Sequence, residues 1–173
     1  MKLGILLPIG SSFKDQKKAG QDKRFVNYYL RNYIKDFEKV YIFSYENENY
    51  RLPKDCVLIS NKFNLNRFVY SFFLVFLYWR IIKKIAVFRV TQLTGVIPAI
   101  LAKIFFKKPF IFTYGYNYSA FAKLEGQNIR SILLKVLERI AVKFSSGVIV
   151  TNKKIESYLK EKYPSIELFY IPN

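Results

Sequence analysis

The sequence contains no histidine, a single cysteine and few acidic residues. The missing imidazole excludes Ser-His-Asp and Cys-His catalysis, imidazole general bases and histidine-ligated metals. Cys56 alone cannot close an internal disulfide, and no CxxC or Cys/His cluster predicts a zinc site, which fits a reducing cytosol. We therefore expect no metal site and assign no catalytic residue in this chain.

Acidic residues are scarce and unevenly placed. The chain has 12 Asp and Glu against 29 Lys and Arg, a net charge of +17 at pH 7. None lies between Cys56 and Leu124, where the basic residues are Lys62, Arg67, Arg80, Lys83, Lys84, Arg89, Lys103, Lys107, Lys108 and Lys123. Nucleic acid would explain this charge, but an anionic lipid surface explains both the charge and the 51% of apolar residues.

No apolar run is long enough to cross a bilayer, because the longest candidate, Phe68 to Trp79, falls well short of the ~20 residues needed. The start of the chain, through Ile9, is too short for a signal peptide and predicts a strand. The segment from Asn66 to Lys84 predicts a helix that is apolar on every side in its first turns. Either a neighbouring element covers its outer side, or it contacts a membrane without spanning it.

The second interpretation predicts a protein that is peripheral on the cytosolic membrane face. Aromatic side chains would sit at interfacial depth, and basic side chains would lie on lipid phosphates. The membrane-binding residues that we predict are Phe72, Phe73, Phe76, Trp79, Arg80, Lys83, Lys84, Lys107 and Lys108.

Apolar, β-rich runs recur along the chain with helical stretches between them. This pattern predicts one α/β domain over residues 1–173, a Rossmann-like parallel sheet of about seven strands with helices on both faces. The expected strands cover residues 2–9, 40–44, 57–60, 87–90, 110–114, 148–151 and 168–171. Apolar helical stripes that are expected to face the core run from Phe25 to Phe37 and from Ile129 to Phe144, and a third helix stops before Pro164. The longest irregular segment is expected between Gly10 and Gly20.

Small, hydroxyl and amide residues follow several of these apolar strands. Since the carboxyl ends of parallel strands meet at one edge, they predict a binding site for sugar hydroxyls or phosphate. Ordinary loop polarity and helix capping are the alternative for any single residue. The predicted substrate-binding residues are Gly10, Ser11, Ser12, Gly20, Gln21, Gln92, Thr94, Gly95, Tyr114, Gly115, Tyr116, Asn117, Thr151 and Asn152.

Other signatures are missing from this edge. Neither a GxGxxG turn after the first strand nor a GxxxxGK[ST] motif is present, which disfavours a dinucleotide-binding dehydrogenase and a P-loop NTPase. Asp15 and Asp22 flank the first loop, but neither is expected to act as a general base.

The order of these elements resembles the N-terminal domain of the family-4 (group 1) glycosyltransferases of the GT-B type. The most specific stretches are Leu137 to Asn152 and Leu168 to Asn173, which resemble the family's helix-strand-helix run and its Ile-Pro-Asn junction. Thr94-Gly95, Pro98-Ala99 and Lys107 to Gly115 resemble the family's fourth-strand loop, the following helix and the fifth strand. The resemblance covers the whole chain.

The resemblance implies an acceptor-binding domain of a retaining, hexosyltransferase-like enzyme with a glycan or lipid-linked acceptor. It also implies that a C-terminal donor-binding domain, absent here, binds the nucleotide-sugar and carries an E-x7-E motif, so no cofactor is expected in this chain and it would not turn over alone. One alternative is a non-catalytic membrane subunit that recruits a separate donor-binding protein. A nucleic-acid-binding module is disfavoured, because the aromatic residues fall on core-facing stripes.

Overall fold

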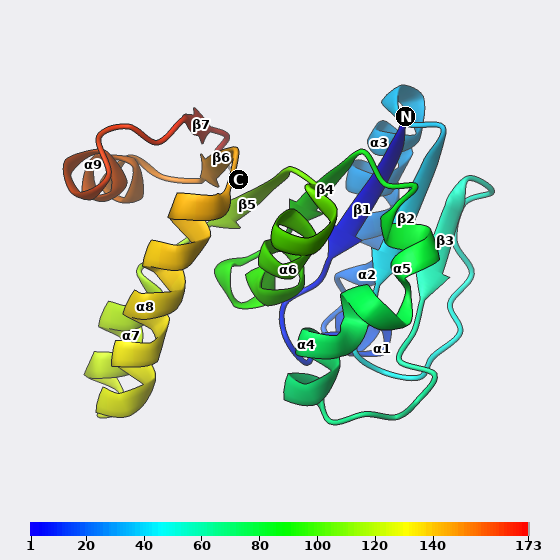
Figure 1. The fold of residues 1–173 in the computed structure, drawn as a ribbon, viewed down its shortest axis with the longest axis horizontal. Coiled ribbons are helices and arrows are strands. Elements are labelled where there is room, and N and C mark those ends of the chain that lie inside the picture. The colour runs from blue at the N-terminus through cyan, green and yellow to red at the C-terminus, as the bar shows by residue number, and fades with distance from the viewer. Residues whose placement is uncertain (173) are drawn as a thin grey trace.

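The computed structural model describes residues 1–172, which form one parallel seven-stranded sheet in the order β3-β2-β1-β4-β5-β6-β7 (Figure 1). This confirms the predicted Rossmann-like α/β fold. The strands are β1 (Lys2–Leu6), β2 (Lys39–Phe43), β3 (Cys56–Ile59), β4 (Val87–Val90), β5 (Phe110–Tyr114), β6 (Gly147–Val150) and β7 (Leu168–Tyr170). The first strand ends at Leu6, three residues before the predicted end.

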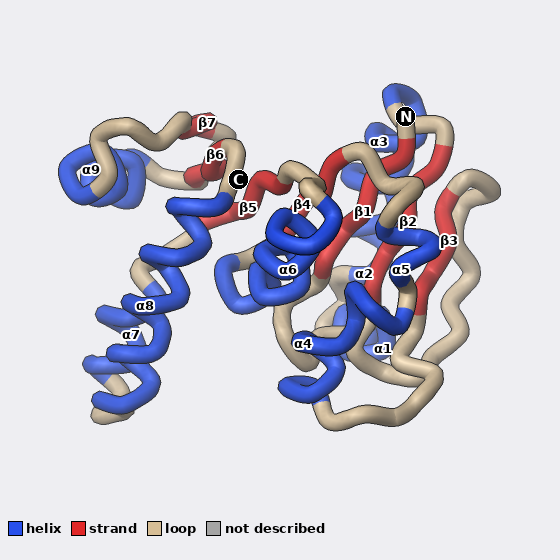
Figure 2. The backbone as a smooth tube through the Cα atoms, in the orientation of Figure 1, coloured by secondary structure: helices blue, strands red, loops and turns tan. Residues whose placement is uncertain are grey.

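The strand order explains why helices cover both faces. The chain moves outward in one direction from β1 to β3 and in the other direction from β4 to β7. Because parallel crossovers are right-handed, the two directions place their helices on opposite faces. Figure 2 shows helices on both sides of the strands. Two apolar clusters result, one under the helices before β2 and the other under the helices after β3.

The helices behind the sheet in Figure 1 are α1 (Phe13–Lys18), α2 (Asp22–Arg24), the π-helical η1 (Phe25–Leu30) and α3 (Arg31–Asp36). The stretch from Gly10 to Gly20 was predicted to be irregular. This prediction is wrong in part, because α1 lies within the stretch. Ser12 starts that helix by accepting a hydrogen bond from the Asp15 amide over 3.0 Å. The helix predicted around Phe25 is present, with a wider π-helical turn in its middle.

The elements of the other cluster are α4 (Arg67–Leu77), α5 (Trp79–Ile82), the 3₁₀ turn η2 (Leu93–Gly95), α6 (Val96–Phe106), α7 (Tyr118–Leu124), α8 (Asn128–Phe144) and α9 (Lys153–Lys162). The predicted helix from Asn66 to Lys84 is broken at Tyr78 into α4 and α5. The Tyr78 hydroxyl donates a hydrogen bond to the Ser60 carbonyl over 2.7 Å. No helix of the described chain is both long and apolar enough to span a membrane.

One side of α4 packs on the core and the other side stays exposed. Tyr70, Leu74 and Val75 are buried, whereas Phe72 and Phe73 expose 52% and 55% of their surface. Helix α6 covers only one edge of this surface, through contact of the Phe76 and Phe105 rings at 5.1 Å between centroids. We call this exposed surface the aromatic face; its members are Phe68, Val69, Phe72, Phe73, Phe76, Trp79, Ile104 and Phe105.

Helix α8 is oriented differently from the prediction. Its apolar stripe was expected to face the core, but Ile129, Ile132 and Leu133 expose 77%, 61% and 64% of their surface. The buried residues are Ser131, Leu134, Glu138, Ala141 and Val142. Small and polar residues lie inward because α7 packs closely along α8, and the Ser131 hydroxyl donates to the Ser119 carbonyl over 2.7 Å. Figure 1 shows α7 and α8 extending together away from the sheet.

Candidate functional site

A cleft of about 650 Å³ opens at the carboxyl ends of the strands. It lies where the strand order reverses between β1 and β4, which is where ligands bind in open α/β sheets. Residues after β1, from α1 to α3, and from β4, β5 and β6 contribute its walls. No Asp or Glu of residues 1–172 lines it.

The alternation of side chains along each strand decides which residues enter the cleft. On β4, Phe88 and Val90 are buried in the core under α4 to α9, so Arg89 and the following Thr91 point to the opposite face. On β5, Thr113 lines the cleft in the same way. Ile149 and Thr151 repeat the pattern at β6. The cleft therefore extends from the strand ends onto the face of the sheet behind β4, β5 and β6.

The structure brings together part of the predicted set. Neutral hydrogen-bonding groups and one aromatic ring surround the mouth of the cleft. The predicted residues that line it are Ser11, Gln21, Gln92, Gly115, Tyr116 and Thr151. The Tyr116 ring is 43% exposed and packs on Tyr118 with the ring centroids 4.0 Å apart. This arrangement offers an exposed aromatic surface next to hydroxyl and amide groups.

Other predicted residues have structural positions outside the cleft lining. Asn117 and Asn152 cap α7 and α9, where their side chains accept hydrogen bonds from the amides of Ala120 and Ile155. The Asn152 amide also donates to the Gly115 carbonyl over 3.3 Å, so it supports the loop that lines the cleft. The predicted residues outside the lining are Gly10, Ser12, Gly20, Thr94, Gly95, Tyr114, Asn117 and Asn152.

Gly95 and Ser12 serve packing. A Cβ atom at Gly95 would lie 2.5 Å from the Leu7 carbonyl oxygen, so only glycine allows η2 to approach the end of β1. Ser12 is fully buried and its hydroxyl is used in capping α1. These positions shape the cleft without lining it.

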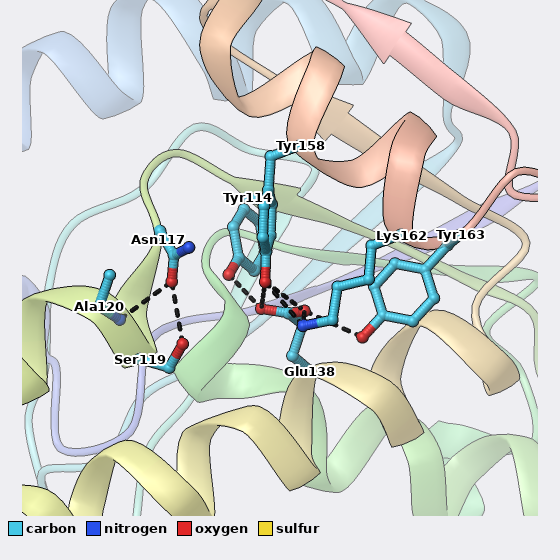
Figure 3. Close-up of polar contacts among 8 residues, drawn as sticks. All are labelled: Tyr114, Asn117, Ser119, Ala120, Glu138, Tyr158, Lys162 and Tyr163. Carbon is cyan, nitrogen blue, oxygen red and sulfur yellow. Dashed lines mark hydrogen bonds and ion pairs between the residues drawn. The ribbon is translucent and has the colours of Figure 1, made fainter.

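Tyr114 points the other way, and the expectation that its side chain lies at the ligand-binding edge is wrong. It follows Thr113 on β5, so its ring enters the core, where it is fully buried. Its hydroxyl donates a hydrogen bond to Glu138 of α8. Figure 3 shows the Tyr158, Lys162 and Tyr163 side chains of the α9 region converging on the same carboxylate.

This Glu138 cluster is an interior ion pair completed by phenol groups. Glu138 is fully buried, and the Lys162 ammonium lies 2.8 Å from its carboxylate. Burial, followed by the hydrogen bond to Glu138, raises the pKa of Tyr114 above its usual range. Burial alone would lower the pKa of Lys162, but its hydrogen bonds and the charge of Glu138 outweigh that effect and raise it. The cluster fastens α8, α9 and β5 together.

Several cleft residues escaped the sequence prediction. They are Gln16, Arg24, Phe25, Tyr29, Tyr33, Arg89, Thr113 and Tyr118. The period-two alternation of a strand was a usable signal for Arg89 and Thr113. Thr113 lies two residues before the predicted site residue Gly115, and Arg89 lies two residues before Thr91, which follows the fourth strand and lines the cleft. The side-chain oxygen of Gln16 and the hydroxyl of Tyr118 are buried without a hydrogen-bond partner in the described structure. A ligand that enters the cleft could supply hydrogen-bond partners for these two buried polar atoms.

The fold and its cleft define a Rossmann-like α/β domain. Among solved structures, the chain is similar to two of sucrose-phosphate synthase from Thermosynechococcus elongatus, each 12% identical in sequence. In one, the match covers all of this chain and 89% of that one, with a TM-score of 0.66. In the other, it covers 99% of this chain and 48% of that one, with a TM-score of 0.71.

This similarity confirms the predicted resemblance at the level of fold. The chain spans about half the length of the longer sucrose-phosphate synthase chain that it matches. No protein-family model and no curated protein sequence matches the chain.

Proposed function

We propose that the chain is the acceptor-binding domain of a retaining glycosyltransferase that transfers a sugar from a nucleotide-sugar to a membrane-associated or lipid-linked glycan. The observation that carries this proposal is the cleft at the reversal point of a GT-B-type sheet. The resemblance of the sequence to family-4 glycosyltransferases assigns the acceptor to this side of the enzyme. The nucleotide-sugar and the paired glutamates belong, on that resemblance, to a C-terminal donor domain.

The cleft residues suit the recognition of sugar hydroxyls. Ser11, Gln92 and Thr151 offer donors and acceptors without charge, and the Tyr116 ring offers an apolar surface for a sugar face. With no carboxylate in its described lining, this cleft binds and orients an acceptor and leaves charge stabilisation to the donor domain.

A binding experiment on the chain tests the acceptor role. In amide NMR titrations with a panel of neutral oligosaccharides, a ligand should shift the signals of the cleft loops, with millimolar to micromolar affinity. Gln92→Ala and Thr151→Val should each weaken binding about tenfold, the value of a hydrogen bond to a well-placed partner. Thr94→Val is the matched control, because Thr94 neighbours the cleft without lining it. Equal affinity in all variants would refute the assignment.

A transfer assay tests the reaction itself. The chain is joined to a C-terminal donor domain, and products from a set of nucleotide-sugars are analysed for the anomeric configuration of the new bond. The proposal is supported if the joined protein forms a product that retains the anomeric configuration of the donor sugar and if Gln92→Ala loses the transfer activity. An inverted product would contradict the retaining assignment.

We further propose that the aromatic face docks on an anionic membrane. It carries exposed rings on α4 and α6, and the exposed basic residues Arg80, Lys83, Lys84 and Lys107 lie next to it. The ammonium of Lys83 lies 4.5 Å from the centre of the Trp79 ring, so basic and aromatic groups already share one surface. Lys108 is less available, since its ammonium donates to the Lys83 carbonyl over 2.7 Å.

Vesicle sedimentation tests this docking. Replacing Arg80, Lys83 and Lys84 by Glu should weaken binding to phosphatidylglycerol-containing vesicles by at least about a hundredfold, since each basic residue contributes ~1 kcal/mol. The matched control replaces Lys23, Arg31 and Lys35 by Glu, which makes the same change in net charge on exposed residues behind the sheet. Phe72→Ser with Phe73→Ser should also weaken binding if rings insert. Equal losses in both charge variants would show that net charge alone drives binding.

The exposed aromatic face also fits the alternative, a membrane subunit that recruits a separate donor-binding protein. The genomic reading frame separates the two proposals. A frame that continues past Asn173 into a Gly-Val-Asp junction and an E-x7-E segment supports the two-domain enzyme and refutes the separate subunit.

A further inference from the structure

Arg89 is the least expected residue of the sheet. It lies within β4, between the fully buried Phe88 and Val90, in a strand that is paired on both sides by β1 and β5. Its side chain points into the deep part of the cleft, where Tyr33 and Thr113 also line the wall. An interior strand position of this kind normally holds an apolar residue.

The Arg89 guanidinium has no anionic partner in the described chain. Its hydrogen bonds go to two neutral groups, the Val90 carbonyl and the Thr113 hydroxyl. The ion pairs among residues 1–172 involve other residues. Burial lowers the pKa of the Arg89 guanidinium, and the nearby phenol groups of Tyr33 and Tyr29 offset only part of that effect. Such groups are costly unless a counter-charge binds.

A second cation and further polar groups line the same cleft. Arg24 of α2 lines it, is exposed and takes part in none of the ion pairs of the described residues. The unpartnered side-chain oxygen of Gln16 lies in the same wall, where it can accept a hydrogen bond from a sugar hydroxyl. Guanidinium groups bind planar and tetrahedral oxyanions through paired N–H donors. The two guanidinium groups therefore have no carboxylate beside them in the described lining of the cleft.

We propose that Arg89 and Arg24 form a subsite for an oxyanion, a phosphate or a carboxylate, carried by the acceptor sugar. This inference rests on the proposed function, because it names the substrate class of the same cleft. The neutral groups near Gln92 and Thr151 bind the sugar hydroxyls, and the two guanidinium groups bind the anionic substituent at the deeper end. The acceptor is therefore an acidic or phosphorylated sugar.

The competing role for Arg89 is structural, as a strut between the sheet and α3. The two roles predict opposite effects on the unliganded protein. Replacing an uncompensated enclosed cation by a similar-sized apolar residue removes a desolvation cost, so Arg89→Met should raise the melting temperature. If Arg89 were a strut, the same change would lower it.

The experiment compares three probes that share a glucose-type ring in amide NMR titrations at constant ionic strength: glucose, glucuronate and glucose 6-phosphate. At least one anionic probe should bind about tenfold or more tightly than glucose, as expected for charge-assisted hydrogen bonds. Glucuronate and glucose 6-phosphate separate a carboxylate from a phosphate, and a preference for either supports the subsite.

Variants assign the effect to the two arginines. Arg89→Met should abolish the preference for the anionic probe and raise the melting temperature, and Arg24→Gln should reduce the preference severalfold. Arg139→Gln is the matched control, because Arg139 is an exposed arginine of α8 away from the cleft. Equal binding of charged and neutral probes, an unchanged preference in Arg89→Met, or a lowered melting temperature in that variant would overturn the proposal.

Repeating the titration with the joined two-domain protein tests one remaining alternative for the partner of Arg89. If the anionic probe binds the isolated chain but not the joined protein, a carboxylate of the second domain is the partner of Arg89, and the proposal fails. Failure of the subsite is distinguishable from failure of the proposed function. Neutral oligosaccharides would still shift the signals of Gln92 and Thr151 if only the anion subsite is wrong.

Discussion

Glu138 shows how one buried side chain fastens three elements. Its carboxylate accepts hydrogen bonds from Tyr114 of β5 and from Tyr158 and Lys162 of α9. Removing one member of a buried charged pair leaves the other members without a partner, so Glu138→Ala should lower the free energy of unfolding by about 3 kcal/mol or more. Denaturant titrations measure the change.

The control for this variant is Glu125→Ala, because Glu125 is exposed and pairs with Arg130 only at 3.8 Å. It should leave stability essentially unchanged. Glu138→Gln keeps the shape and one acceptor oxygen, so its loss of stability should be smaller than that of Glu138→Ala. Equal stability of Glu138→Ala and Glu125→Ala would show that the cluster contributes nothing to the fold.

The hydrogen bond between Tyr50 and Asp22, next to the cleft, makes a second contribution to stability. This contribution depends on pH. The Tyr50 hydroxyl donates to the Asp22 carboxylate over 2.6 Å, and this bond lowers the pKa of Asp22 below its ordinary 3.8. The same bond, together with burial, raises the pKa of Tyr50 to about 12. Asp22 begins α2, which carries Arg24, so the bond also fixes one wall of the cleft.

The sign of the pH effect follows from these directions. A lowered carboxyl pKa adds stability that is present above pH 3.8 and is lost as the pH falls through the folded-state pKa. A raised tyrosine pKa adds stability that is present below pH 10.0 and is lost as the pH rises toward 12. Tyr50→Phe should remove both contributions, and NMR titration should find the pKa of Asp22 closer to 3.8. An unchanged Asp22 pKa in that variant would contradict the assignment.

At the same residue scale, the candidate site was only partly predictable. The edge positions were recognisable because polar residues follow apolar strands, which holds for Gln92 and Thr151. Tyr114 was misassigned because an edge position was taken without the alternation that turns its side chain into the core. Arg24 and Tyr33 could not be found, because their place in the cleft depends on how α2 and α3 cross the sheet.

At the scale of the element, α8 offers a matched pair of neighbouring leucines on one helix. Leu134 is buried at 9% exposure, and Leu133 exposes 64% of its surface. Leu134→Ala should destabilise the protein by about 2–3 kcal/mol through lost packing. Leu133→Ala has the same helix-propensity change and should cost less than about 0.5 kcal/mol.

Thermal and denaturant unfolding of the two variants measures which face of α8 packs on the molecule. The reverse order of the two losses would mean that the apolar stripe, not the face with Ser131 and Glu138, packs inward. A vesicle-binding assay on the same variants also reports whether the exposed stripe contacts lipid.

Most elements were predictable, and the exceptions have local causes. The strands were found to within a few residues because parallel strands buried on both faces are short apolar runs, as in Val148 to Val150. Helix α1 was missed because its polar stretch, Lys14 to Lys18, carries no apolar stripe. The predicted orientation of α8 was wrong because its inner face packs on α7 and on Tyr114. The periodicity of the helix predicts neither contact.

At the scale of the whole molecule, the high net positive charge affects the stability of the fold. A net charge of +17 on one domain opposes its compact state by self-repulsion. Added salt screens that repulsion, since the Debye length falls from about 30 Å at 0.01 M to about 8 Å at 0.15 M. The melting temperature should therefore rise with sodium chloride over this range, by about 2–4 °C for each kcal/mol of repulsion that is relieved.

The chloride titration also separates general screening from the proposed anion subsite. Chloride should stabilise the wild-type chain, Arg89→Met and Arg139→Gln by similar amounts, because screening depends on the total charge. Inorganic phosphate at the same ionic strength should add a further, saturable rise in the wild type and in Arg139→Gln. That excess should vanish in Arg89→Met, because an ion that binds only the folded state stabilises it by mass action. Identical chloride and phosphate curves for all three proteins would mean that the molecule responds to anions only through its overall charge.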